Sequence, residues 1–170
     1  MARQLDVLYH GKFSYSIFIE ESFDGLRKAV DGLELSLRRA LIVSDEHVAP
    51  LYLKAVQEAL QSSFRELHTL ILTSGEEHKN TDSIAEIYEA AVQAEFDRKD
   101  VFIALGGGVI GDMTGFAAAT YMRGIRFIQI PTTLLAQVDS SIGGKTGVDF
   151  RSYKNMVGAF HMPSLVYSNV

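Results

Sequence analysis

The feature that most constrains the fold is a regular alternation of short apolar segments with longer amphipathic ones. Four apolar runs have the length of buried strands, at residues 39–43, 67–72, 101–105 and 125–130. Segments with helical spacing of apolar residues follow them at 49–60, 81–96, 109–121 and 132–139. Strands that alternate with helices form crossover units, so the sequence predicts an α/β domain with a mostly parallel sheet and helices on both faces.

The two ends of the chain add to this pattern. Residues 5–9 and 15–19 alternate in polarity on either side of Gly11, which predicts an N-terminal β-hairpin. Helical spacing also runs through residues 22–35. Residues 164–170 favour one more strand, which we expect to be exposed because no capping helix or turn follows it. For the same reason we expect the natural protein to continue beyond residue 170.

Length and composition define the class of protein. The 170 residues are 47% hydrophobic and 22% charged, typical of one globular domain. The chain has no cysteine, which excludes disulfides and thiolate metal sites. A net charge of -5, from 21 acidic and 16 basic residues, argues against nucleic-acid binding. We expect no membrane span or signal peptide, and a cytoplasmic location.

The strongest motif is the glycine-rich segment 106–112, which follows a predicted buried strand and begins a helix. Glycines let the backbone approach a ligand closely, and the free amides of a first helical turn favour a phosphate. The spacing satisfies G-x-G-x-x-G. However, Arg126 stands where an acidic residue would hold a ribose, and the motif follows the third strand of the series. A tight turn without a ligand is the alternative.

A second polar segment, Ser74 to Lys79, also follows a predicted strand. Ligands of open parallel sheets bind beyond the carboxyl ends of the strands, where this segment would lie. Its glutamates can accept from ribose hydroxyls, and Lys79 can donate to hydroxyl or phosphate oxygens. The alternative is a solvated charged loop.

Two more polar segments follow the fourth predicted strand. Thr132 and Thr133 either cap a helix or contact a ligand, and Asp139 in a Ser/Gly-rich turn is equally ambiguous. The Gly-Lys-Thr sequence at 144–146 is no P-loop, because Asp139 occupies the position of its first glycine. Lys145 and Lys154–Asn155, which we place in glycine-containing loops, either bind one anion or are exposed and unrelated.

Taken in order, residues 105–160 resemble the 3-dehydroquinate synthase family. The resemblance rests on the glycine segment, on residues 130–147 and on Lys154–Asn155, and weaker similarity extends back to about Ser44. It implies that residues 1–170 form a Rossmann-like NAD-binding domain. It also implies a C-terminal helical domain, absent from this chain, that holds zinc or cobalt. The reaction that it implies is conversion of 3-deoxy-D-arabino-heptulosonate 7-phosphate to 3-dehydroquinate and phosphate, with transient oxidation by NAD. The resemblance also implies that the full-length protein is a homodimer.

The resemblance also assigns roles to residues. Contacts with NAD are implied for Asp45, Ser74, Gly75, Glu76, Lys79, Gly107, Gly108, Val109, Ile110, Gly111, Asp112, Thr132, Thr133, Asp139, Lys145 and Lys154. Catalytic or substrate contacts are implied for Asp139, Lys145, Lys154 and Asn155. No metal ligand is expected in this chain, whose five histidines lack metal-binding spacing.

Three alternatives stay open at this point. The chain could come from another sugar-phosphate cyclase, because residues 149–153 vary in the family; the glycerol-dehydrogenase-like group fits residues 134–145 poorly. It could be a non-catalytic NAD-binding module. It could also be a structural domain without a ligand, which would require Glu76, Lys79, Lys145 and Lys154 all to be incidental.

Overall fold

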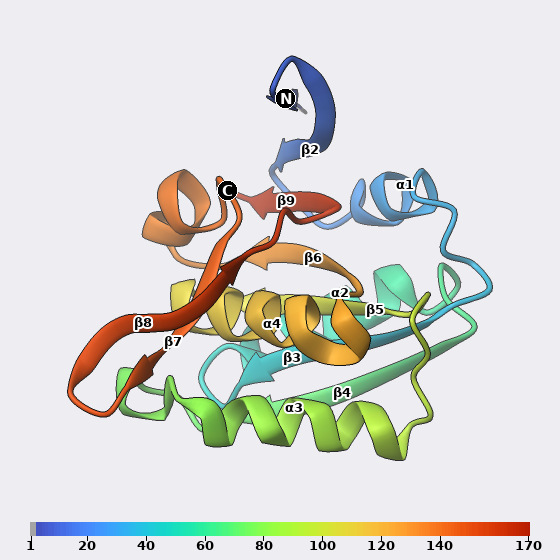
Figure 1. Ribbon diagram of the computed structural model, residues 1–170. Coiled ribbons are helices and arrows are strands. Elements are labelled where there is room, and N and C mark those ends of the chain that lie inside the picture. The colour runs from blue at the N-terminus through green and yellow to red at the C-terminus, as the bar shows by residue number, and fades with distance from the viewer. Residues whose placement is uncertain (1–2) are drawn as a thin grey trace.

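Seven strands form one sheet in the order β1-β2-β9-β6-β5-β3-β4 in the computed structural model, which describes residues 3–170 (Figure 1). All neighbouring strands are parallel except β1 and β2. The strands are β1 (Arg3–Tyr9), β2 (Lys12–Glu20), β3 (Arg39–Asp45), β4 (Glu66–Leu72), β5 (Val101–Gly106), β6 (Arg126–Pro131) and β9 (Leu165–Asn169). The helices are α1 (Leu26–Asp31), α2 (Ala49–Leu60), α3 (Thr81–Gln93) and α4 (Gly108–Thr120). The expected mostly parallel α/β sheet with an N-terminal hairpin is therefore confirmed.

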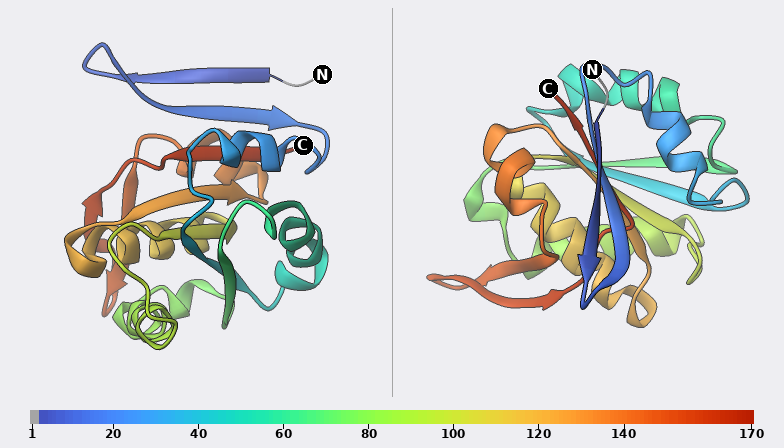
Figure 2. Two further views of the ribbon diagram at one scale, coloured as in Figure 1. Left: turned by 90° about the vertical axis from the view of Figure 1, so that its right-hand side faces the viewer. Right: turned by 90° about the horizontal axis from the view of Figure 1, so that it is seen from above.

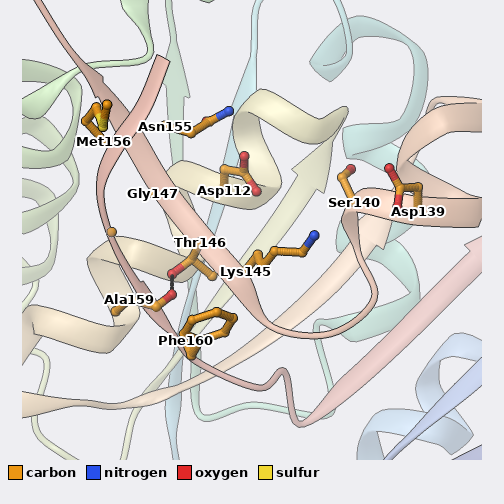
Figure 3. Close-up of a pocket in the computed structure, with 11 residues that line it drawn as sticks. Asp112, Asp139, Ser140, Lys145, Thr146, Gly147, Asn155, Met156, Ala159 and Phe160 are labelled. Carbon is orange, nitrogen blue, oxygen red and sulfur yellow. Dashed lines mark hydrogen bonds between the residues drawn. The ribbon is translucent and has the colours of Figure 1, made fainter. Parts of the chain in front are cut away.

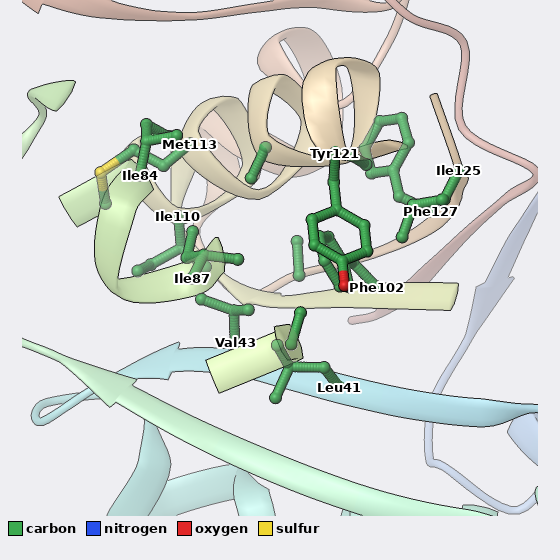
Figure 4. Packing of buried hydrophobic residues seen from close by; sticks show 14 of the residues in the cluster. Leu41, Val43, Ile84, Ile87, Phe102, Ile110, Met113, Tyr121, Ile125 and Phe127 are labelled. Carbon is green, nitrogen blue, oxygen red and sulfur yellow. The ribbon is translucent and has the colours of Figure 1, made fainter. Parts of the chain in front are cut away.

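Alternate residues of each central strand face opposite layers of helices. Leu41 and Val43 of β3 pack in a cluster with buried residues of α3 and α4 (Figure 4). Ala40 and Ile42 of the same strand pack with α1 and α2 on the other face. This alternation follows from the two-residue period of a strand, and it buries both faces of the sheet. A strand covered on both sides needs an apolar residue at every position, as the sequence of β5 has.

The parallel strands end at one edge of the sheet, and the polar segments follow them there. Asp45 ends β3, Gly106 ends β5 and Pro131 ends β6. The chain winds outward from β3 to β4 and then returns to place β5 on the other side of β3. The connections after β3 and β5 therefore leave in opposite directions, and ligands of open α/β sheets commonly bind at such a point.

A second, two-stranded sheet was not expected from the sequence. Strands β7 (Lys145–Phe150) and β8 (Tyr153–Phe160) pair antiparallel and extend beyond α4 (Figures 1 and 2). Our assignment of residues 145–147 and 154–158 to loops was wrong, whereas Gly143 and Gly144 lie outside any strand as expected. The glycines explain both the error and the pairing, because Gly147 and Gly158 face each other so closely that a β-carbon on Gly158 would strike the opposite backbone.

Other differences concern the ends and exposure of elements. Helix α1 covers only 26–31 of the predicted 22–35 and lies between Gly25 and Gly32, and α3 stops at Gln93. Strand β4 is half-exposed because it lies at the edge of the sheet. The helix predicted at 132–139 begins at Leu134 and continues as a short π-helix, η3 (Ala136–Ser140).

The last strand is buried, contrary to our expectation. Strand β9 pairs with β2 on one side and β6 on the other, and four of its five residues are buried. The N-terminal hairpin therefore joins the main sheet through β9, so residues far apart in the sequence complete one another's hydrogen bonding. Among residues 3–170, no helix is both long and apolar enough to cross a membrane.

Candidate functional site

A pocket of about 460 Å³ lies where α4, η3 and the β7–β8 hairpin meet (Figure 3). Its walls are Asp112, Asp139, Ser140, Lys145, Thr146, Gly147, Asn155, Met156, Gly158, Ala159 and Phe160. Asp112 comes from the second turn of α4, and Lys145 and Asn155 come from the two strands of the hairpin. The structure thus gathers four predicted site residues, Asp112, Asp139, Lys145 and Asn155, around one cavity.

The glycine turn brings the N-terminus of α4 close to the segment after β6. Gly107 precedes the helix in an extended conformation, and no side chain caps its first turn. A β-carbon on Gly107 would lie 3.2 Å from Thr133 Cγ2, and one on Gly108 would lie 3.0 Å from Ser140 Oγ. The missing side chains therefore leave room at a helix end whose free amides favour an anion.

Lys79 is the centre of a charged cluster beside the pocket. Its amine donates to Asp112 Oδ2 and to Asn155 Oδ1, each at 2.6 Å, and the residue is only 4% exposed. Burial raises the pKa of Asp112, and the Lys79 ammonium opposes that rise. Glu76 and Asp149 add a smaller upward shift of the same pKa through charge repulsion. The pairing with Lys79 thus supports a carboxylate at the edge of the cavity.

A second ion pair ties the same loop to the hairpin at its surface. Lys154 Nζ donates to Glu76 Oε1 at 3.0 Å, and this contact raises the pKa of Lys154. Asp149 contributes in two ways: its backbone amide donates to Lys79 O at 2.8 Å, and its carboxylate accepts from the Asn155 amide at 2.7 Å. Residues predicted to bind one ligand are therefore also bonded to one another.

Two charged groups of the pocket have no such partner. Neither Lys145 nor Asp139 forms a side-chain hydrogen bond or ion pair with any residue between 3 and 170. In Figure 3 the Lys145 amine extends into the space between Asp112 and Ser140. A lone ammonium facing a cavity next to a helix N-terminus is suited to hold an anionic or hydroxyl-rich ligand.

The paired threonines differ in the partners of their hydroxyls. Thr133 Oγ1 accepts from the Ala136 amide at 3.3 Å, which is the capping role. The Thr132 hydroxyl is buried and has no partner among the described residues, while its backbone amide donates to Gly106 O at 3.0 Å. A buried hydroxyl without a partner costs stability, so Thr132 fits a position that a ligand atom completes.

The remaining predicted residues lie outside the pocket wall. The Asp45 carboxylate accepts from the amides of His47 and Val48, which is a structural role at the end of β3. Ser74 donates to Glu46, and Gly75 has φ 117°, a conformation that favours glycine.

Within α4, the side chains of two predicted residues point into the core. Val109 and Ile110 pack in the hydrophobic cluster, so only their backbone amides could serve a ligand. Gly111 is buried against Gln129, since a β-carbon there would lie 2.7 Å from the glutamine Oε1. The geometry therefore limits this part of the motif to backbone contacts.

Several residues of the site were missed from the sequence. Ser140 and Phe160 line the pocket, and Asp149 holds the hairpin to the loop after β4. The β-branched and aromatic residues of the two segments, Thr146, Val148, Phe150, Tyr153, Val157 and Phe160, are typical of strands and could have indicated the hairpin. Among the described residues no group of three or more histidines, cysteines and carboxylates could hold a metal ion, so a metal would need other ligands.

Comparisons with known proteins agree with this geometry. Residues 69–170 match the family model described as 3-dehydroquinate synthase N-terminal. The chain belongs to the 3-dehydroquinate synthase family. It is 52% identical over 160 residues to the 3-dehydroquinate synthase of Hydrogenovibrio crunogenus, covering 92% of this chain and 43% of that protein. That of Ruminiclostridium cellulolyticum is 50% identical over 160 residues, 92% of this chain and 44% of the relative. The chain thus spans less than half the length of these relatives.

Solved structures of related cyclases share the fold. A 2-deoxy-scyllo-inosose synthase complexed with carbaglucose-6-phosphate, NAD+ and Co2+ superposes with a TM-score of 0.87 at 26% identity, over 99% of this chain and 46% of that one. A 2-epi-5-epi-valiolone synthase from Streptomyces hygroscopicus with NAD+ and Zn2+ bound gives 0.81 at 32% identity, over 97% and 45%. Membership of the 3-dehydroquinate synthase family, expected from the motifs, is confirmed.

Proposed function

We propose that residues 1–170 are the NAD-binding part of a 3-dehydroquinate synthase, which converts 3-deoxy-D-arabino-heptulosonate 7-phosphate to 3-dehydroquinate and phosphate. The observation that carries the proposal is the uncapped N-terminus of α4, which lies at the carboxyl end of β5 and beside a pocket lined by Asp112 and Lys145. A dinucleotide needs both features, amides for its pyrophosphate and a carboxylate for ribose hydroxyls.

The residues present fit NAD on a further structural ground. Gly107 and Gly108 leave space that a side chain would fill, and the buried Thr132 hydroxyl lacks a partner. In the proposal, the amides of Gly108 to Gly111 bind the pyrophosphate, Asp112 accepts from a ribose hydroxyl, and Thr132 donates to the cofactor. Lys79 keeps Asp112 ionised and in place, with Glu76 closing that side.

The other end of the pocket is suited to the substrate. Lys145 is free to donate to hydroxyl or phosphate oxygens, and Asp139 is free to accept from substrate hydroxyls. Asn155 also lines the opening. NAD supplies reversible hydride acceptance, and a divalent metal held outside the described residues would polarise the hydroxyl that is oxidised. Lys145 contributes positive charge beside the phosphate that leaves, while Lys154 holds Glu76 on the cofactor side.

Calorimetric titration of NAD into this chain tests the binding role. Gly108→Ala should weaken NAD binding at least tenfold, because the added methyl group would fill space that the proposal gives to the cofactor. The fold should be kept, because only the Ser140 hydroxyl must move, by a few tenths of an ångström. Gly32→Ala at the end of α1, a position remote from the pocket, is the matched control and should bind like the wild type. Equal affinity for the Gly108 and Gly32 variants would contradict the proposed site.

Phosphate release by the complete gene product tests the activity. Loss of release from 3-deoxy-D-arabino-heptulosonate 7-phosphate in Lys145→Met, with NAD affinity within a few-fold of the wild type, would support the substrate role of that lysine. The structural neighbours favour a second candidate, another sugar-phosphate cyclase. Release from a different sugar phosphate, and none from this one, would select it. Homodimerisation and a cytoplasmic location stay predictions.

A further inference from the structure

The β7–β8 hairpin carries an irregularity at the point where it meets the pocket. Val148 pairs with Val157 and Phe150 pairs with Tyr153, so the single residue Asp149 stands opposite three residues of β8. Those three are Lys154, Asn155 and Met156. A bulge of this kind re-aims side chains and frees backbone groups from the ladder.

Asn155 adopts an unusual conformation within this bulge. Its φ is +54°, a left-handed value that asparagine tolerates better than most residues but that still needs support from its surroundings. Asn155 has no partner in the strand register, and its backbone amide donates to Asp149 Oδ1 at 2.7 Å. That bond is therefore the support which the hairpin provides for this conformation.

Asp149 also connects the hairpin to the loop after β4. Its own amide donates to the carbonyl of Lys79 at 2.8 Å, and the amine of the same lysine donates to Asn155 Oδ1 at 2.6 Å. The three residues form a closed ring of hydrogen bonds, with Asp112 attached through Lys79. Asp149 itself does not line the pocket, so any effect it has on a ligand is transmitted by its neighbours.

We propose that Asp149 is a positioning residue whose carboxylate holds the β8 bulge and thereby keeps Asn155 against Lys79, the lysine that holds Asp112 at the cofactor site. This inference rests on the proposed NAD-binding function and assigns a role to a residue outside the pocket wall. The role depends on an oxygen acceptor at this place and not on charge. Asparagine can replace the carboxylate in that role, whereas alanine cannot.

The experiment compares Asp149→Ala with Asp149→Asn by two measurements on the 170-residue chain. The first is hydrogen exchange of the Asn155 backbone amide, which needs no ligand. Exchange should be at least tenfold faster in the alanine variant and within about threefold of the wild type in the asparagine variant. Asp97→Ala is the matched control, because Asp97 accepts the Lys99 amide in the same way far from the pocket.

The second measurement is the NAD dissociation constant at a temperature where all variants are folded. Asp149→Ala should raise it about tenfold, and Asp149→Asn and Asp97→Ala should leave it within about threefold. If Asp149 had a structural role alone, the alanine variant would be less stable, but NAD affinity would not fall with alanine and return with asparagine.

Two results would overturn the inference: unchanged Asn155 exchange in Asp149→Ala, or equal defects in the alanine and asparagine variants. If the wild-type chain fails to bind NAD, the binding proposal fails for this chain. The exchange of the Asn155 amide then decides by itself whether Asp149 holds the bulge.

Discussion

Replacement of Lys79 by methionine tests the charged cluster at the centre of the site. The Lys79 side chain is 5% exposed and that of Asp112 is 21% exposed, so the variant leaves a largely buried carboxylate without its counter-charge. Breaking a buried pair in this way costs about 3–5 kcal/mol. Because Asp112 keeps some contact with water, we expect about 3 kcal/mol less unfolding free energy at pH 7.

The loss should depend on pH with a defined sign. Burial already raises the pKa of Asp112 above 3.8, and removal of Lys79 takes away the contact that lowers it. An acid whose folded-state pKa is raised contributes stability that is fully present below its unfolded pKa and lost as the pH rises through the folded pKa. The loss of unfolding free energy in the variant, relative to the wild type, should therefore shrink between pH 7 and pH 4. It should shrink by about 1.4 kcal/mol for each pH unit below the pKa that Asp112 has in the variant.

Urea unfolding of wild type and variant at several pH values measures this difference. Lys54→Met is the matched control, because Lys54 forms an exposed pair with Glu58 at 3.9 Å and its loss should be too small to resolve at any pH. Adding Asp112→Asn to Lys79→Met should recover part of the stability at pH 7. A defect independent of pH, or a double variant no more stable than the single one, would refute the reasoning.

Three further predictions concern the frame around the site. Burial raises the pKa of Tyr167 to about 12 from 10.0. The stability that the neutral phenol contributes is therefore fully present below pH 10 and is lost as the pH rises through 12. Tyr167→Phe, which also loses the hydrogen bond to Ser22 O, should remove about 2–3 kcal/mol of that alkaline decline in urea unfolding; an unchanged decline would contradict it. Gly115→Ala should cost about 1–2 kcal/mol of unfolding free energy in thermal unfolding, because the new β-carbon collides with Thr146 Cγ2. Adding Thr146→Ser, which removes that methyl group, should restore part of the loss; stability changes of the two variants that simply add would disprove the contact. Asn80→Ala should cost about 1 kcal/mol and Asn80→Asp much less, because the side chain accepts from two amides in the first turn of α3; equal losses measured in urea would argue against the cap.

The sequence by itself determined the frame on which the site is built. Alternation of apolar strands with helical segments predicted the parallel sheet, and the two-residue period of a strand explains why Leu41 and Ile42 lie on opposite faces. The glycine segment after β5 predicted the close turn at the N-terminus of α4, where Gly107 now lies against Thr133. These features are local, since spacing and turn chemistry act within a few residues of the chain.

Only the tertiary structure decided how the polar side chains are used. Lys79 contacts Asp112 and Asn155 across 33 and 76 positions, and Lys154 contacts Glu76 across 78, so no local pattern could place them together. The same is true of the pairing of β7 with β8 and of the burial of β9 between β2 and β6. Charged residues in loops carry no periodic signal, and their partners depend on which strand ends the sheet brings side by side. The sequence therefore predicted a ligand site at these strand ends, and the packing of distant segments decided which groups line the pocket there.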